Sequence, residues 1–91
     1  MATQYEWIVE ELEGEDIVNV NHWDTYAEAL KGAEDLGPHR IGLVRESGGY
    51  LNWTKAWAYV VDGVLPADML DAYDNVVTHV PKKYRDQFAK A

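Results

Sequence analysis

The sequence contains no cysteine. This absence excludes a disulfide framework, a thiolate nucleophile and a zinc site with thiolate ligands. No apolar run approaches the ~18 residues that a membrane-spanning helix needs. No charged, apolar and small-residue leader precedes Tyr5 either. We therefore expect a cytoplasmic protein without a membrane segment.

Basic residues are scarce, and they are unevenly placed. The chain has 8 Lys and Arg against 16 Asp and Glu, for a net charge of −8. All of this excess lies in residues 1–37, which carry ten acids and only one base, Lys31. We call the densest part of it the acidic front, formed by Glu11, Glu13, Glu15 and Asp16. Such a field repels phosphate backbones and favours basic partners, or serves only solubility.

Although cysteine is absent and basic residues are scarce, the chain has the composition of a folded protein. Its 91 residues are 47% hydrophobic and include four Trp and six Tyr, which favours a packed core over disorder. Length and composition together predict one domain over residues 1–91.

The first half of the chain predicts a hairpin followed by a helix. Residues 5–12 are rich in aromatic and β-branched residues, and after a turn at 13–16 the chain can return as a second strand. Thr25 and Glu28 have the spacing of a capping box, so a helix is expected over about residues 25–36, packed on a sheet face. Gly37 and Pro38 are expected to end it.

The second half predicts two strands and then helices. Residues 39–46 and 53–61 have the pattern of strands, and Asp62–Gly63 is a turn signal. Pro66 and Pro81 are each placed to start a short C-terminal helix. The expected fold is α+β, with a small antiparallel sheet of three to four strands, one packed helix and one or two short C-terminal helices.

The segment KAWAYVVD, Lys55 through Asp62, resembles the RNP1 strand of RNA-recognition motifs, whose aromatic side chains stack on bases. Two positions depart from that pattern, because Ala56 stands where RNP1 has glycine and Asp62 where it has its last aromatic residue. The negative charge of the acidic first strand would also repel the phosphates of a bound nucleic acid. Binding of single-stranded nucleic acid is therefore an alternative, and a strand that packs is the simpler interpretation.

Successive side chains of a strand point to opposite faces of the sheet, so the aromatic residues of this strand are predicted to share one face. A cluster of exposed rings is unusual on a soluble monomer, so either the protein's own helices or another chain should cover it. Both remain open from the sequence. The predicted interaction residues are Trp53, Trp57 and Tyr59, joined by Tyr5 and Trp7.

No assembly of catalytic or metal-binding residues is recognisable. Ser47, the only serine, has no nucleophile-elbow motif around it, and His22 and Asp24 have no nucleophile beside them. The three histidines are 17 and 40 residues apart, without the spacing of a zinc site. We expect no catalytic residues, no metal and no cofactor; an enzyme would require His22, Asp24 or Ser47 to converge in a pocket.

The segments YEWIVEEL, HWDTYAEAL, RIGLVRE and AWAYVVDGVLP are together similar to a group of small uncharacterised bacterial and prophage-type proteins, over residues 5–66. The resemblance implies a compact single domain of phage-related origin and no established activity. By analogy with small acidic phage proteins, it raises the hypothesis of an inhibitor whose carboxylates imitate the phosphates of nucleic acid.

These observations favour a non-catalytic protein that works through protein–protein contact, with another protein or with a second copy of itself as a homodimer. The aromatic face would supply the apolar anchor and the acidic front the specificity. The alternatives are the acidic inhibitor and the module for single-stranded nucleic acid.

Overall fold

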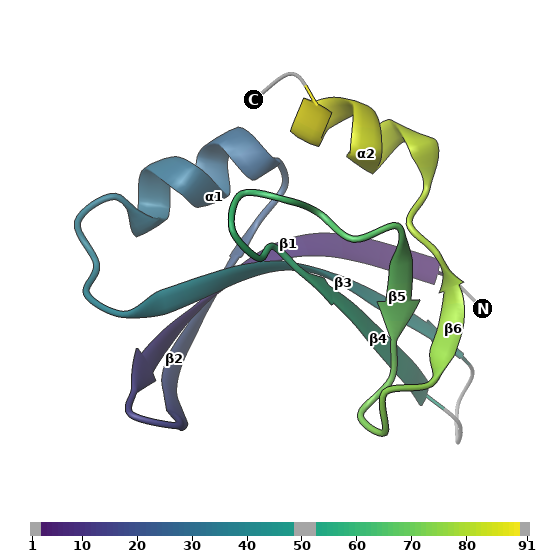
Figure 1. Cartoon of the computed structure of the whole chain (residues 1–91), viewed down its shortest axis with the longest axis horizontal. Helices are drawn as coiled ribbons and strands as arrows, with labels where there is room; N and C mark the ends of the chain where they lie inside the picture. The colour runs from purple at the N-terminus through teal and green to yellow at the C-terminus, as the bar shows by residue number, and fades with distance from the viewer. Residues whose placement is uncertain (1–2, 49–52, 90–91) are drawn as a thin grey trace.

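The computed structural model describes residues 3–48 and 53–89, which form one antiparallel sheet and two helices (Figure 1). The strands follow the order β2-β1-β3-β4-β5-β6 across the sheet. They are β1 (Thr3–Glu13), β2 (Asp16–Trp23), β3 (His39–Gly48), β4 (Trp53–Tyr59), β5 (Asp68–Leu70) and β6 (Val76–His79). The helices are α1 (Tyr26–Ala33) and α2 (Lys82–Ala89), and neither is long and apolar enough to cross a membrane.

The prediction of a three- to four-stranded sheet is wrong, because the segment after Pro66 forms β5 and β6 and not a helix. A turn that the Asp71 side chain stabilises accounts for the two strands. The Asp71 carboxylate accepts hydrogen bonds from the backbone N–H groups of Tyr73 (2.8 Å) and Asn75 (3.0 Å). Asp74 adopts a left-handed backbone with φ of 64°, which Asp tolerates better than most residues. The chain therefore reverses at 71–75, and the β-branched residues that follow enter the sheet.

Helix α1 begins where the capping box predicts. The Thr25 hydroxyl accepts a hydrogen bond from the Glu28 backbone N–H at 3.1 Å, and the Glu28 carboxylate lies 3.1 Å from the same hydroxyl. The helix ends at Ala33, earlier than predicted, and its C-cap is Glu34 and not Gly37. Helix α2 lies within the second predicted C-terminal helix, directly after Pro81.

The core lies between the sheet and the two helices. Trp7 of β1 is fully buried, and its ring contacts Tyr26 of α1 (centroids 5.1 Å apart) and Tyr84 of α2 (6.5 Å). Tyr26 in turn contacts Phe88 of α2 at 4.6 Å. Both helices are therefore held on the same side of the sheet, and Figure 1 shows them over the convex side of an arch.

One close approach between helix and sheet allows a test of this packing. A Cβ atom on Gly32 of α1 would lie 2.4 Å from Cζ2 of the Trp23 ring, whereas a Cβ on Gly37 would meet nothing within 4 Å. We expect Gly32→Ala to destabilise the protein by about 1–3 kcal/mol despite the better helix propensity of Ala, because the indole must shift. Urea unfolding measures this free energy. Gly37→Ala is the matched control, and equal effects of the two variants would contradict the packing of α1 on Trp23.

Candidate functional site: the open face of the sheet

The face of the sheet opposite the helices is not covered by any described element, and we call it the open face. Residues directly opposite one another in an antiparallel pair share a face. One row across the open face therefore joins Leu70, Trp57 and Val44, and the next joins Tyr59, Gly42 and Ile8 with His22. In Figure 1 this is the concave side of the arch.

Tyr59 lies near the centre of the open face and is fixed by three neighbours. Its ring rests on Gly42, where a Cβ atom would lie 2.7 Å from Cδ1 of the ring. The Arg40 guanidinium lies 4.0 Å from the ring centroid, and Arg40 Nε donates a hydrogen bond to the buried carboxylate of Glu10 at 2.5 Å. Burial raises the pKa of the Tyr59 hydroxyl, the Glu10 carboxylate raises it further, and Arg40 opposes the change. The hydroxyl is therefore neutral and the ring is held in place.

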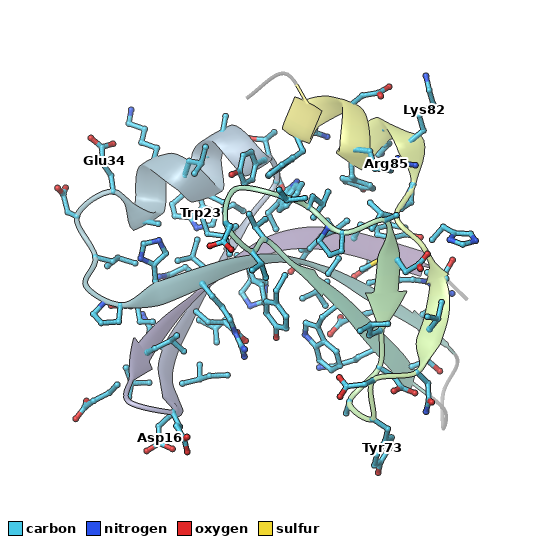
Figure 2. The ribbon with its side chains drawn as sticks, viewed as in Figure 1. Asp16, Trp23, Glu34, Tyr73, Lys82 and Arg85 are labelled. Carbon is cyan, nitrogen blue, oxygen red and sulfur yellow. The ribbon has the colours of Figure 1, made fainter. Side chains whose placement is uncertain are left out.

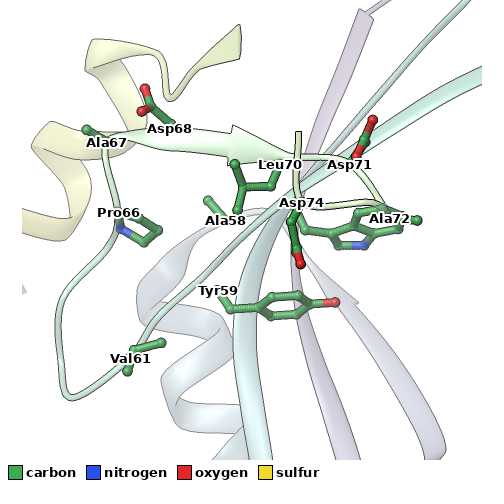
Figure 3. Close-up of a pocket in the computed structure, with 11 residues that line it drawn as sticks. Ala58, Tyr59, Val61, Pro66, Ala67, Asp68, Leu70, Asp71, Ala72 and Asp74 are labelled. Carbon is green, nitrogen blue, oxygen red and sulfur yellow. The ribbon is translucent and has the colours of Figure 1, made fainter. Parts of the chain in front are cut away.

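A cavity of about 680 Å³ opens beside Tyr59, between β4 and the β5–β6 hairpin (Figure 3). It exists because β4 and β5 are paired at only one position, where Trp57 lies opposite Leu70. Residues 60–67 connect the end of β4 to the start of β5. This volume is within the range of small-ligand sites. Its lining residues are Trp57, Ala58, Tyr59, Val61, Pro66, Ala67, Asp68, Leu70, Asp71, Ala72 and Asp74.

Every charged residue that lines this cavity is an aspartate. The Asp68 carboxylate lies 2.5 Å from Nδ1 of His79. The backbone N–H groups of Asn75 and Tyr73 lower the pKa of the Asp71 carboxyl, since they hydrogen bond to its ionised form. The Asp74 backbone N–H donates a hydrogen bond to the Asp71 carbonyl (3.1 Å), but the Asp74 carboxylate has no hydrogen bond or ion pair to another described residue. The cavity therefore combines an aromatic and aliphatic wall with negative charge.

The five predicted aromatic residues do not share one face. Trp57 and Tyr59 lie on the open face, half-buried. Tyr5 and Trp7 lie on the helix face, where Trp7 is fully buried and Tyr5 contacts Tyr84 at 5.0 Å. The prediction that they join Trp57 is wrong, because the sheet register aligns Trp7 with Leu43 and Ala58. The Trp53 side chain lies outside the described part of the chain.

The acidic front lies at the far end of the arch from the cavity. Glu13, Glu15 and Asp16 surround the exposed turn between β1 and β2, while Glu11 accepts a hydrogen bond from the Asn19 amide at 2.5 Å. Figure 2 shows Asp16 at one end of the arch and Tyr73, beside the cavity, at the other. The structure therefore does not bring the acidic front and the aromatic pair together.

The basic residues of the RNP1-like strand region do not form a row of unpaired cations beside Trp57. Lys55 forms an ion pair with Glu46 at 3.1 Å. Arg45 lies opposite Ala56 and Tyr5, on the helix face. Together with the aspartates of the cavity, this arrangement gives the surroundings of Trp57 the wrong sign for phosphates.

The candidate catalytic residues also do not converge. His22 lies opposite Ile8 and pairs with Glu6 at 2.5 Å, whereas Ser47 lies opposite Thr3, five positions away along β1. Five positions along a strand are roughly 16 Å. Among the described residues no group of three His, Asp or Glu side chains could hold a metal ion.

Sequence reasoning missed the hairpin side of the cavity, because it expected a helix there. Leu70, Asp71 and Asp74 belong to that side. The signal was present in the segment DAYDN, whose two aspartates and asparagine are typical of turns.

Comparison of the chain with protein-family models, with curated proteins and with solved structures found no match. The similarity to small bacterial and prophage-type proteins therefore stays an expectation from the sequence, and the candidate site rests on its own geometry.

The turn at Asp71 predicts a pH dependence of stability. Its folded-state pKa lies below the ordinary value of 3.8, so its contribution is present above that pH and is lost as the pH falls through the folded pKa. We expect Asp71→Asn, which keeps a hydrogen-bond acceptor, to lose less stability than wild type between pH 7 and pH values below 3.8. Urea unfolding at both pH values measures the difference. Asp62→Asn, at an exposed site, should behave as wild type; an Asp71→Asn curve equal to wild type would contradict this role.

Proposed function

We propose that this protein is a non-catalytic binding module that recognises a partner protein through its open face. The observation that carries the proposal is the pair Trp57 and Tyr59, which neither of the two described helices covers and which lines the 680 Å³ cavity. Aromatic residues beside a pocket are typical anchors of protein interfaces, because they bury much area at a low cost in conformational entropy.

The shape of the open face favours a segment of another protein over a second copy of this chain. The face is concave, so it is complementary to a convex element such as a helix or a single extended strand. Two copies that met through their concave faces would touch at the ends of the arch and leave the aromatic pairs apart. A homodimer through this face is thus the less favoured form of the proposal.

Neither alternative function has a specific observation in its favour. An inhibitor that imitates nucleic acid needs carboxylates spaced like phosphates along a rigid surface, whereas the exposed part of the acidic front surrounds one hairpin turn. A module for single-stranded nucleic acid needs free cations beside Trp57, and Lys55 there is paired with Glu46.

Selection of binding peptides tests which surface of the protein is the interaction surface. Peptides enriched from a displayed random library on the folded protein should shift the NMR signals of Trp57, Tyr59 and Leu70. We expect Trp57→Ala to weaken their binding at least about tenfold, which is the effect of losing a hot-spot aromatic residue. Leu30→Ala, at an exposed position on α1, should change binding less than about twofold.

A second pair of variants tests the same surface without removing packed atoms. Val61 and Val64 are each 62% exposed and bridge to one another, but only Val61 lines the cavity. Val61→Trp should block peptide binding, and Val64→Trp should not. Peptides that map to the helix side, or that bind Val61→Trp and Trp57→Ala as well as wild type, would overturn the proposal. Light scattering shows whether a second copy occupies the face instead.

A further inference from the structure

The cavity beside Tyr59 has two kinds of wall. The side chains of Val61, Pro66 and Leu70 form an apolar part with the Trp57 ring, and the charged part is made of aspartates alone. An apolar stem displaces water from the first part. The second part attracts a positive charge. A ligand that fits both carries a cation at the end of an apolar stem.

Asp74 is the carboxylate best placed to receive that cation. Asp68 is paired with His79, and Asp71 is occupied by the N–H groups of its own turn. Asp74 has no such partner among the residues that the structure describes. In Figure 3 its carboxylate points toward the Tyr59 ring, whereas those of Asp68 and Asp71 point away.

The open face already holds one cation in the same manner. The Arg40 guanidinium lies 4.0 Å from the Tyr59 ring centroid and is neutralised by Glu10. An aromatic ring attracts a cation electrostatically, and a nearby carboxylate strengthens the site. The cavity offers the same two groups, the Tyr59 ring and the Asp74 carboxylate, but no Lys or Arg is among its lining residues. Because Glu10 neutralises Arg40, that arginine does not repel a second cation strongly.

We propose that the cavity binds a lysine or arginine side chain of the partner segment. The stem of that side chain packs against Trp57 and Leu70, and its charged head lies between the Tyr59 ring and the Asp74 carboxylate. Long basic side chains suit this geometry, because their methylene stems bury readily while the head keeps polar partners. This inference rests on the proposed function, since it assigns the chemistry of the partner at the same surface.

Short peptides with matched neutral counterparts test the charge requirement. The probes are acetylated and amidated Gly-Gly-Lys-Gly-Gly and Gly-Gly-Arg-Gly-Gly, with norleucine in place of Lys and citrulline in place of Arg as controls. NMR titration of the labelled protein should show shifts at Trp57, Leu70 and Asp74. We expect the charged peptides to bind at least about fivefold more tightly than the neutral ones, the effect of a weak cation–π and ion-pair contact. Added salt should reduce the difference.

Two aspartates with the same backbone conformation provide matched variants. Asp74 and Asp62 both have positive φ, 64° and 52°, and only Asp74 lines the cavity. Asp74→Asn should lose most of the preference for charged peptides, because only the Tyr59 ring then contacts the charged head, and Asp62→Asn should keep the wild-type preference. Asn tolerates this backbone as Asp does, so both variants should fold, which their NMR spectra show directly.

The outcomes separate this inference from the proposed function. Equal affinity for charged and neutral peptides in the wild-type protein, or equal losses in Asp74→Asn and Asp62→Asn, overturns the basic side-chain site. If library peptides still map to the open face in that case, the proposed function stands without it. If charged probes occupy the cavity while library peptides bind elsewhere, the cavity chemistry stands and the proposed function fails.

Discussion

The burial of Trp7 is the interaction on which the rest of the structure depends. Its ring is fully buried and contacts an aromatic residue from each helix, Tyr26 of α1 and Tyr84 of α2. Large aromatic side chains contribute much of the apolar area that a small domain can bury. One residue of β1 therefore draws together segments from both halves of the chain and places both helices on one side of the sheet.

This one-sided arrangement creates the candidate site. With both helices on the convex side, Trp57 and Tyr59 face the concave side, where none of the described helices or strands covers them. Part of this face is closed to solvent, since Ile8 and Glu10 are buried there and Glu10 is paired with Arg40. The region around the cavity differs, because β4 and β5 pair at only one position and leave an aromatic wall accessible. The proposed binding role is based on this separation of β4 and β5 and not on a sequence motif.

Local patterns in the sequence predicted the first half of the fold and helix α2, but the prediction was wrong over residues 66–77. The hairpin of β1 and β2 and the cap at Thr25 depend on contacts within a few residues, so local sequence patterns are sufficient to predict them. Residues 66–77 carry two competing signals, a proline suited to a helix start and the turn residues of DAYDN. The buried position of Met69 in the core favours the strand, and only the tertiary structure supplies that core.

The sequence by itself determined the strong negative charge, the presence of the aromatic strand, and the alternation that places Trp57 and Tyr59 on the same side of it. It could not determine which side of that strand the helices would cover. That choice depends on Ala56 and Ala58, whose small side chains leave room on that face for the helices and the Trp7 ring. It also depends on the register that aligns these alanines with the core residues of β1 and β3. Only the tertiary structure, through packing between distant segments, left the aromatic pair open beside Asp74.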